Sequence, residues 1–171
     1  MKLLVMVFGA MLLLASCGDQ PAASKPVAKV SKDFPGLFVE NIDGAVQITE
    51  ARKLKAGDKV VVTGKVMGAD EVFVEGRAFV LLGDPAILKS CDTIEDDGCE
   101  TPWDVCCDSD KAKKAGTLSV QVVDKDGKIM KIGLKGQAGL KELSMITVKG
   151  TVSADSSADV MTVNAESISI K

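Results

Sequence analysis

Apolar and polar residues alternate along several short segments of the chain, which is the pattern of half-buried β-strands. These segments are rich in Val and Ile and are bounded by turn residues such as Gly, Asp and Ser. The segments are residues 59–67, 72–82, 117–123, 128–134, 145–152 and 160–170. Asp126-Gly127 is a strong hairpin signal, so residues 128–134 are expected to pair back on the preceding strand.

Two short helices interrupt this pattern. Residues 49–55 form the first, where Thr49 can cap the start and Gly57 can end it in a left-handed turn. Residues 137–143 suit a helical turn. Short strands at this spacing with so little helix predict an all-β fold, either a sandwich or a barrel.

An internal echo favours the barrel. The pattern Val60-x-Val62-x-Gly64-x-Val66 recurs as Ile146-x-Val148-x-Gly150-x-Val152. A glycine within a strand permits a bulge or a sharp bend, and a small barrel needs such corners in order to close. Two ordinary half-buried strands would give the same pattern. With this echo, the stretch from Gly57 to Ile170 resembles an OB-fold, and the resemblance implies a small five-stranded barrel with a binding face for single-stranded nucleic acid or oligosaccharide.

The first seventeen residues have the layout of an export signal. Lys2 precedes an apolar run from Leu3 to Leu14, and the small residues Ala15 and Ser16 suit a peptidase cut. The run Leu14-Ala15-Ser16-Cys17 resembles the bacterial lipobox, which implies cleavage after residue 16 and acylation of Cys17. An ordinary secretory signal with a chance cysteine is the alternative.

The lipobox resemblance implies a location as well as a modification. The lipid at Cys17 would attach the protein to a membrane of the cell envelope. Gly18 follows the cysteine where an Asp would favour retention at the inner membrane, so the resemblance implies the outer membrane, facing the periplasm.

The domain organisation follows from where the apolar pattern begins. Residues 1–16 are the expected signal peptide, 17–44 a lipidated cysteine with a flexible tether, and 45–171 the barrel domain. The tether is rich in Pro, Ala, Ser and Lys, which leaves too little apolar surface for a core. Its last part contains Phe34, Leu37 and Phe38, which could dock on the domain.

Composition narrows the function classes. Removal of the signal takes away Lys2 and leaves 20 basic residues against 24 acidic ones, a net charge of −4. A nucleic-acid ligand is not expected, because such sites combine a positive groove with stacking aromatics. The chain has no His, and no set of catalytic residues is apparent, so we expect no enzyme activity and assign no catalytic residue.

One segment, residues 91–110, stands apart as a cysteine-rich acidic insertion between two predicted strands. It contains Cys91, Cys99, Cys106 and Cys107, together with eight acidic residues. Its element Pro102-Trp103-Asp104-Val105-Cys106-Cys107 resembles one found in a group of uncharacterised secreted bacterial proteins, and the resemblance implies no activity.

The four cysteines favour disulfides, since an exported chain folds in an oxidising compartment. Adjacent Cα atoms lie only about 3.8 Å apart, so Cys106 and Cys107 would each pair with Cys91 or Cys99 rather than with one another. A site with four thiolate ligands for zinc or copper(I) is one alternative, although the spacing C-x7-C-x6-C-C is not a usual zinc pattern. A thiol-redox pair is the other, although nearby carboxylates oppose thiolate formation.

The insertion is also the candidate contact surface. Its binding residues are predicted to be Asp92, Glu95, Asp96, Asp97, Glu100, Trp103 and Asp104. A solvated acidic loop is the simpler interpretation of the carboxylates, and a weak calcium site is the sharper one. The sequence therefore predicts a lipid-anchored envelope module that binds an envelope protein or a glycan and holds no cofactor. The alternative is a metal-binding or thiol-redox lipoprotein that uses the same cysteines.

Overall fold

The computed structural model describes residues 31–94 and 98–171. The predicted signal peptide and Cys17 lie outside these residues, as do Glu95, Asp96 and Asp97. Within the described ranges, no helix has both the length and the apolar character needed to span a membrane.

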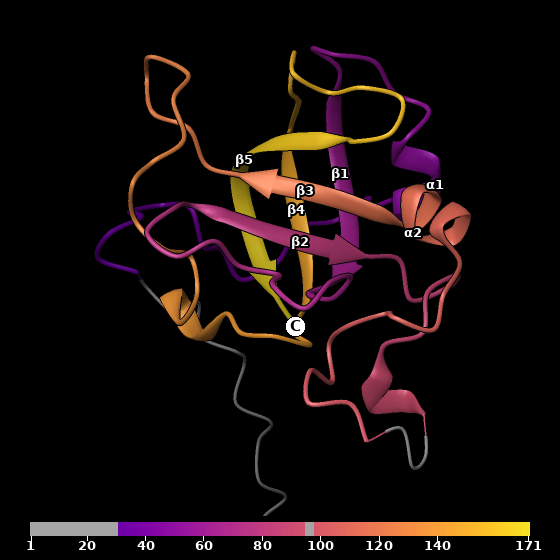
Figure 1. Cartoon of the computed structure of the whole chain (residues 1–171). Coiled ribbons are helices and arrows are strands. Elements are labelled where there is room, and N and C mark those ends of the chain that lie inside the picture. The colour runs from indigo at the N-terminus through magenta and orange to yellow at the C-terminus, as the bar shows by residue number, and fades with distance from the viewer. Residues whose placement is uncertain (1–30, 95–97) are drawn as a thin grey trace, which may run out of the picture.

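Five strands form a closed barrel in the order β1-β2-β3-β5-β4 (Figure 1). The strands are β1 (Lys59–Lys65), β2 (Phe79–Gly83), β3 (Thr117–Gln121), β4 (Met145–Val152) and β5 (Thr162–Ile170). Only β3 and β5 pair in parallel, and the other neighbours are antiparallel. The all-β prediction of a small five-stranded OB-like barrel is thus confirmed.

The two echoed segments are partners in this barrel. β1 and β4 pair antiparallel along their length, with Val62 opposite Val148. Gly150 marks a register shift between β4 and β5, and a Cβ there would lie 2.2 Å from the carbonyl oxygen of Asn164. The sequence predicted that a small residue is needed at the bend. The structure gives the reason, which is that the backbones of two strands approach closely there.

The core fills the barrel and is closed at one end by α1 (Ile48–Ala51), whose Ile48 and Ala51 are fully buried. The strand residues that are completely shielded from solvent are Val62, Val80, Leu82, Val120, Ile146, Val148, Val163 and Ile168. Along β2 and β4 these positions alternate, as the inward face of a barrel requires, and in β5 the register shift lies between Val163 and Ile168.

The domain begins earlier than residue 45. Phe34, Leu37 and Phe38 are buried in the same core, and the backbone N–H of Val39 donates to the Ile168 carbonyl at 2.9 Å. The prediction of a flexible tether up to residue 44 is wrong for 31–39, because the apolar residues of this stretch bury themselves against β5. Their docking on the domain is confirmed.

Some element boundaries differ from the predictions. Residues 72–78 and 128–134 form only isolated bridges, Phe73–Val80 and Val123–Ile129. The Asp126-Gly127 turn is present, with the Gly127 N–H donating to the Asp124 carbonyl. The predicted helical turn is reduced to η2 (Gln137–Gly139).

The first helix also starts differently. Thr49 does not cap α1 with its own side chain, because it lies inside the helix. Its N–H and hydroxyl instead donate to the buried carboxylate of Asp84, which follows β2. A carboxylate from another part of the chain thus accepts a backbone N–H in the first turn of this helix.

Candidate functional site

The long connection between β2 and β3, residues 84–116, carries the cysteines and projects from one end of the barrel (Figure 1). It contains the short 3₁₀ helix η1 (Cys91–Thr93) and ends in α2 (Asp110–Gly116), which packs beside α1. The hydroxyl of Ser109 accepts the Ala112 N–H and caps α2.

A second, smaller core fastens this connection to the barrel. Met67, Leu88 and Val105 are buried against one another, and Trp103 packs on both this cluster and the barrel core. Gly83 permits the approach, since a Cβ there would lie 2.7 Å from the Met67 side chain. The connection is therefore packed against the barrel by side chains that are far apart in sequence.

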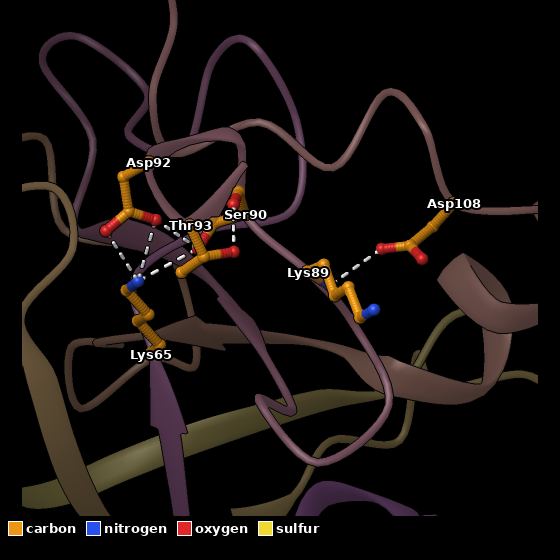
Figure 2. Close-up of polar contacts among 6 residues, drawn as sticks. All are labelled: Lys65, Lys89, Ser90, Asp92, Thr93 and Asp108. Atoms are coloured by element: carbon orange, nitrogen blue, oxygen red, sulfur yellow. Dashed lines mark hydrogen bonds and ion pairs between the residues drawn. The ribbon is translucent and has the colours of Figure 1, made fainter. Parts of the chain in front are cut away.

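Backbone hydrogen bonds bring the two cysteine-bearing ends of the connection together. The Cys91 N–H donates to the Asp104 carbonyl at 2.9 Å, and the Asp92 N–H donates to the Pro102 carbonyl at 2.8 Å. The Lys89 N–H donates to the carboxylate of Asp108 at 2.8 Å, as Figure 2 shows. These contacts place Cys91 next to the Cys106-Cys107 pair.

Three sulfurs gather as a result. The Sγ atoms of Cys91, Cys99 and Cys106 all lie within 4.8 Å of one another. Cys91 Sγ lies 3.6 Å from Cys106 Sγ, and Cys106 Sγ lies 3.9 Å from Cys107 Sγ. Cys91 is buried, Cys99 is half-buried, and Cys106 and Cys107 are exposed. The cluster thus opens from the interior of the loop towards solvent.

No pair of these four sulfurs lies at the disulfide bonding distance of about 2.05 Å. The two predicted disulfides are therefore not formed in this structure. The proximity of the predicted partners is nevertheless borne out, because Cys106 and Cys91 are neighbours although fourteen residues lie between them.

Two lysines from outside the acidic segment face the cluster. Lys65, the last residue of β1, donates to the Ser90 hydroxyl at 2.8 Å and forms an ion pair with Asp92 at 3.0 Å (Figure 2). Lys113 of α2 donates to the Cys106 carbonyl at 3.4 Å. Lys65 could not be assigned to this segment from local sequence, because β1 approaches it only in three dimensions, and Lys113 follows the segment on a helix that was not predicted.

The ion pair with Lys65 fixes the carboxylate of Asp92 in place. Partial burial raises the pKa of its carboxyl, but hydrogen bonds from Ser90 and Lys65 outweigh burial, and the pKa lies below its usual range. Asp92 is thus a structural anchor beside Cys91 rather than an open cation ligand. Asp104 likewise accepts the N–H of Val105, at 2.7 Å. Within the described ranges, the side chains that gather as a possible metal-binding group are Cys91, Cys99 and Cys106, and three of the four carboxylates of the calcium hypothesis, residues 95–97, lie outside these ranges.

A groove of about 560 Å³ lies beside the loop. Trp103 forms one wall, with its indole N–H donating to the Asp70 carbonyl at 2.8 Å. The other lining residues come from the β1–β2 connection and from the segment before β4: Asp70, Glu71, Val72, Phe73, Val74, Glu75, Gly76, Gly133, Lys135 and Glu142. The lining has four carboxylates against one ammonium, so the groove suits a cationic or neutral ligand. Of the predicted contact residues that the structure describes, only Trp103 lines it. Glu100 is exposed on the loop.

Comparison with known proteins adds no assignment: no protein-family model and no curated protein matches the sequence.

Proposed function

We propose that the protein is a cell-envelope lipoprotein whose OB-like barrel carries a thiolate site for a soft metal ion, Zn²⁺ or Cu⁺. The observation that carries this proposal is the convergence of the Cys91, Cys99 and Cys106 sulfurs within 4.8 Å of one another. The lipid at Cys17 and the envelope location are parts of the proposal that rest on the first eighteen residues.

The sulfur separations suit a metal centre. A zinc–thiolate bond is about 2.3 Å long, so two thiolates on a tetrahedral ion lie about 3.8 Å apart. The Cys91–Cys106 distance of 3.6 Å is close to that value. An ion could therefore bind Cys91 and Cys106 with little change in their separation, and Cys99 lies within 4.8 Å of both.

The surroundings also support a cation with thiolate ligands. Lys65 bonds the side chains of Ser90 and Asp92 on either side of Cys91, Lys113 bonds the backbone carbonyl of Cys106, and partners of this kind orient metal ligands. Soft thiolates select Cu⁺ and Zn²⁺ over hard cations such as Ca²⁺. A bound ion would also offset the negative charge of three neighbouring thiolates.

Metal content and thiol state test the proposal together. The full-length protein, purified in mild detergent without oxygen, should carry one equivalent of Zn²⁺ or Cu⁺ after loading, and its intact mass should show no loss of hydrogen. Cys91→Ser should abolish stoichiometric binding, because it removes the buried ligand. Glu100→Gln is the matched control and should bind as the wild type does, since Glu100 is an exposed neighbour of Cys99.

A second candidate function is the disulfide-braced binding module that the sequence favours. The groove beside Trp103 supports it, because it offers aromatic and acidic contacts at the base of the loop. A mass four hydrogens lower, with no metal retained, would favour this module and contradict the metal site.

A further inference from the structure

Cys107 stands beside the three-sulfur cluster without belonging to it. Its sulfur lies 3.9 Å from that of Cys106, but the group of sulfurs within 4.8 Å of one another consists of Cys91, Cys99 and Cys106. We propose that Cys107 is an exchange ligand, through which the ion leaves the site for an acceptor with sulfur donors. This inference rests on the proposed metal site and assigns that site a role in metal transfer.

The exposure of the sulfurs gives the site a direction. Cys91 is only 4% exposed and lies at the closed end, whereas Cys106 and Cys107 are both exposed at the open end. Among the described residues, the adjacent pair is the most exposed part of the cluster, and an acceptor can approach the ion there. A site built solely to brace the loop would need no second exposed thiol there.

The short distance between the adjacent sulfurs makes the exchange step simple. The Cys107 thiol gives its proton to water and its sulfur bonds to the ion, while the bond from the ion to Cys106 breaks and Cys106 takes up a proton. An acceptor thiolate then displaces the remaining ligands one at a time, and each protein thiolate is reprotonated. No electron is gained or lost, so the step needs no oxidant or reductant.

The charges around the open end define the acceptor. Glu100, Asp104, Asp108 and Asp110 lie on the same segment as the exposed pair, and Lys113 is bonded to the Cys106 carbonyl. The carboxylates along this segment disfavour an anionic acceptor and favour one whose sulfur donors sit on a neutral or basic surface.

Adjacent substitutions test the inference on the full-length protein in detergent, loaded without oxygen with either Zn²⁺ or Cu⁺. The ion is then drawn off by a coloured chelator, pyridylazoresorcinol for Zn²⁺ and bicinchoninate for Cu⁺. Cys107→Ser should keep one ion per chain at an unchanged equilibrium affinity, yet release it roughly tenfold more slowly, because the lower-barrier route is lost. Cys106→Ser should instead lower the affinity by about 10–100-fold or more. Changing a residue that only orients a ligand costs that much, and losing a ligand should cost at least as much.

Three results would overturn the inference, and they are distinguishable. Equal release rates for the wild type and Cys107→Ser would show that Cys107 takes no part in exchange. A loss of affinity in Cys107→Ser as large as that in Cys106→Ser would make Cys107 a permanent fourth ligand. Failure of the wild type to retain either ion would reject the proposed metal site itself, and the exchange role with it.

Discussion

At the scale of single residues, Lys65 links the barrel to the cysteine cluster. Its ammonium bonds Ser90 and Asp92 on both sides of Cys91. We predict that Lys65→Met lowers the metal affinity of the proposed thiolate site by about tenfold, because partners that orient a ligand contribute at that scale. Competition with a chelator of known affinity measures the change. Lys128→Met, on an exposed turn, is the control, and an equal loss in both variants would contradict the prediction.

Glu166 shows what a surface pair contributes. Its hydrogen bond from Lys59 lowers the pKa of the Glu166 carboxyl, partial burial opposes that shift, and Thr151 adds to it. A lowered pKa in the folded state means that the pair stabilises the protein above the ordinary pKa of 4.5, and that this contribution disappears as the pH falls further.

Because the pair is largely exposed, solvent screening keeps its contribution between about 0 and 1 kcal/mol. Glu166→Gln should therefore cost less than about 1 kcal/mol of unfolding free energy near neutral pH. Urea denaturation should show the difference from the wild type shrinking as the pH falls through the lowered folded-state pKa of Glu166, because the protonated carboxyl is then as uncharged as the Gln side chain. A deficit that persists in acid would show that packing, not charge, is responsible.

At the scale of elements, the contact between β4 and β5 depends on a missing side chain. Gly150→Ala would place a methyl group 2.2 Å from the Asn164 carbonyl oxygen, and backbone cannot move aside as a side chain can. We expect a loss of about 1–3 kcal/mol in unfolding free energy, as for overpacked positions elsewhere. Gly133→Ala, whose new carbon would have its nearest neighbour 3.9 Å away, should change thermal stability little. Similar losses in both variants would contradict this account.

The elements also show what the sequence could predict. β4 has its predicted bounds and β1 differs only at its end. Both were predictable because their alternating Val and Ile residues mark the side of a strand that faces the barrel interior. α2 was not predicted, because its residues DKAKKAG have no apolar stripe and the helix depends on the Ser109 cap and on packing beside α1. The cysteine segment was located by composition, but Lys65 and Gly83, which position it, belong to β1 and β2, and no local pattern reveals them.

At the scale of the whole molecule, the barrel and the loop have separate cores joined by Trp103. Val105→Ala should loosen the small cluster and weaken metal retention while the barrel keeps its thermal stability. Val62→Ala should lower the unfolding free energy by about 1–3 kcal/mol, as cavities in a core do. Calorimetry and chelator competition on both variants separate the two effects. If Val105→Ala unfolds the protein as readily as Val62→Ala, loop and barrel are one cooperative unit.

The burial of Phe34 and Phe38 has a mechanical consequence. Any tension applied to the chain ahead of residue 31 would reach the barrel through these rings and through the bond from Val39 to Ile168 beside β5. The first structure to yield would be this docked segment, and peeling it away would uncover apolar surface on the core. If the protein is held by its N-terminus, this docked segment would detach first under force. The force would act on β5 before it acted on the cysteine loop that follows β2.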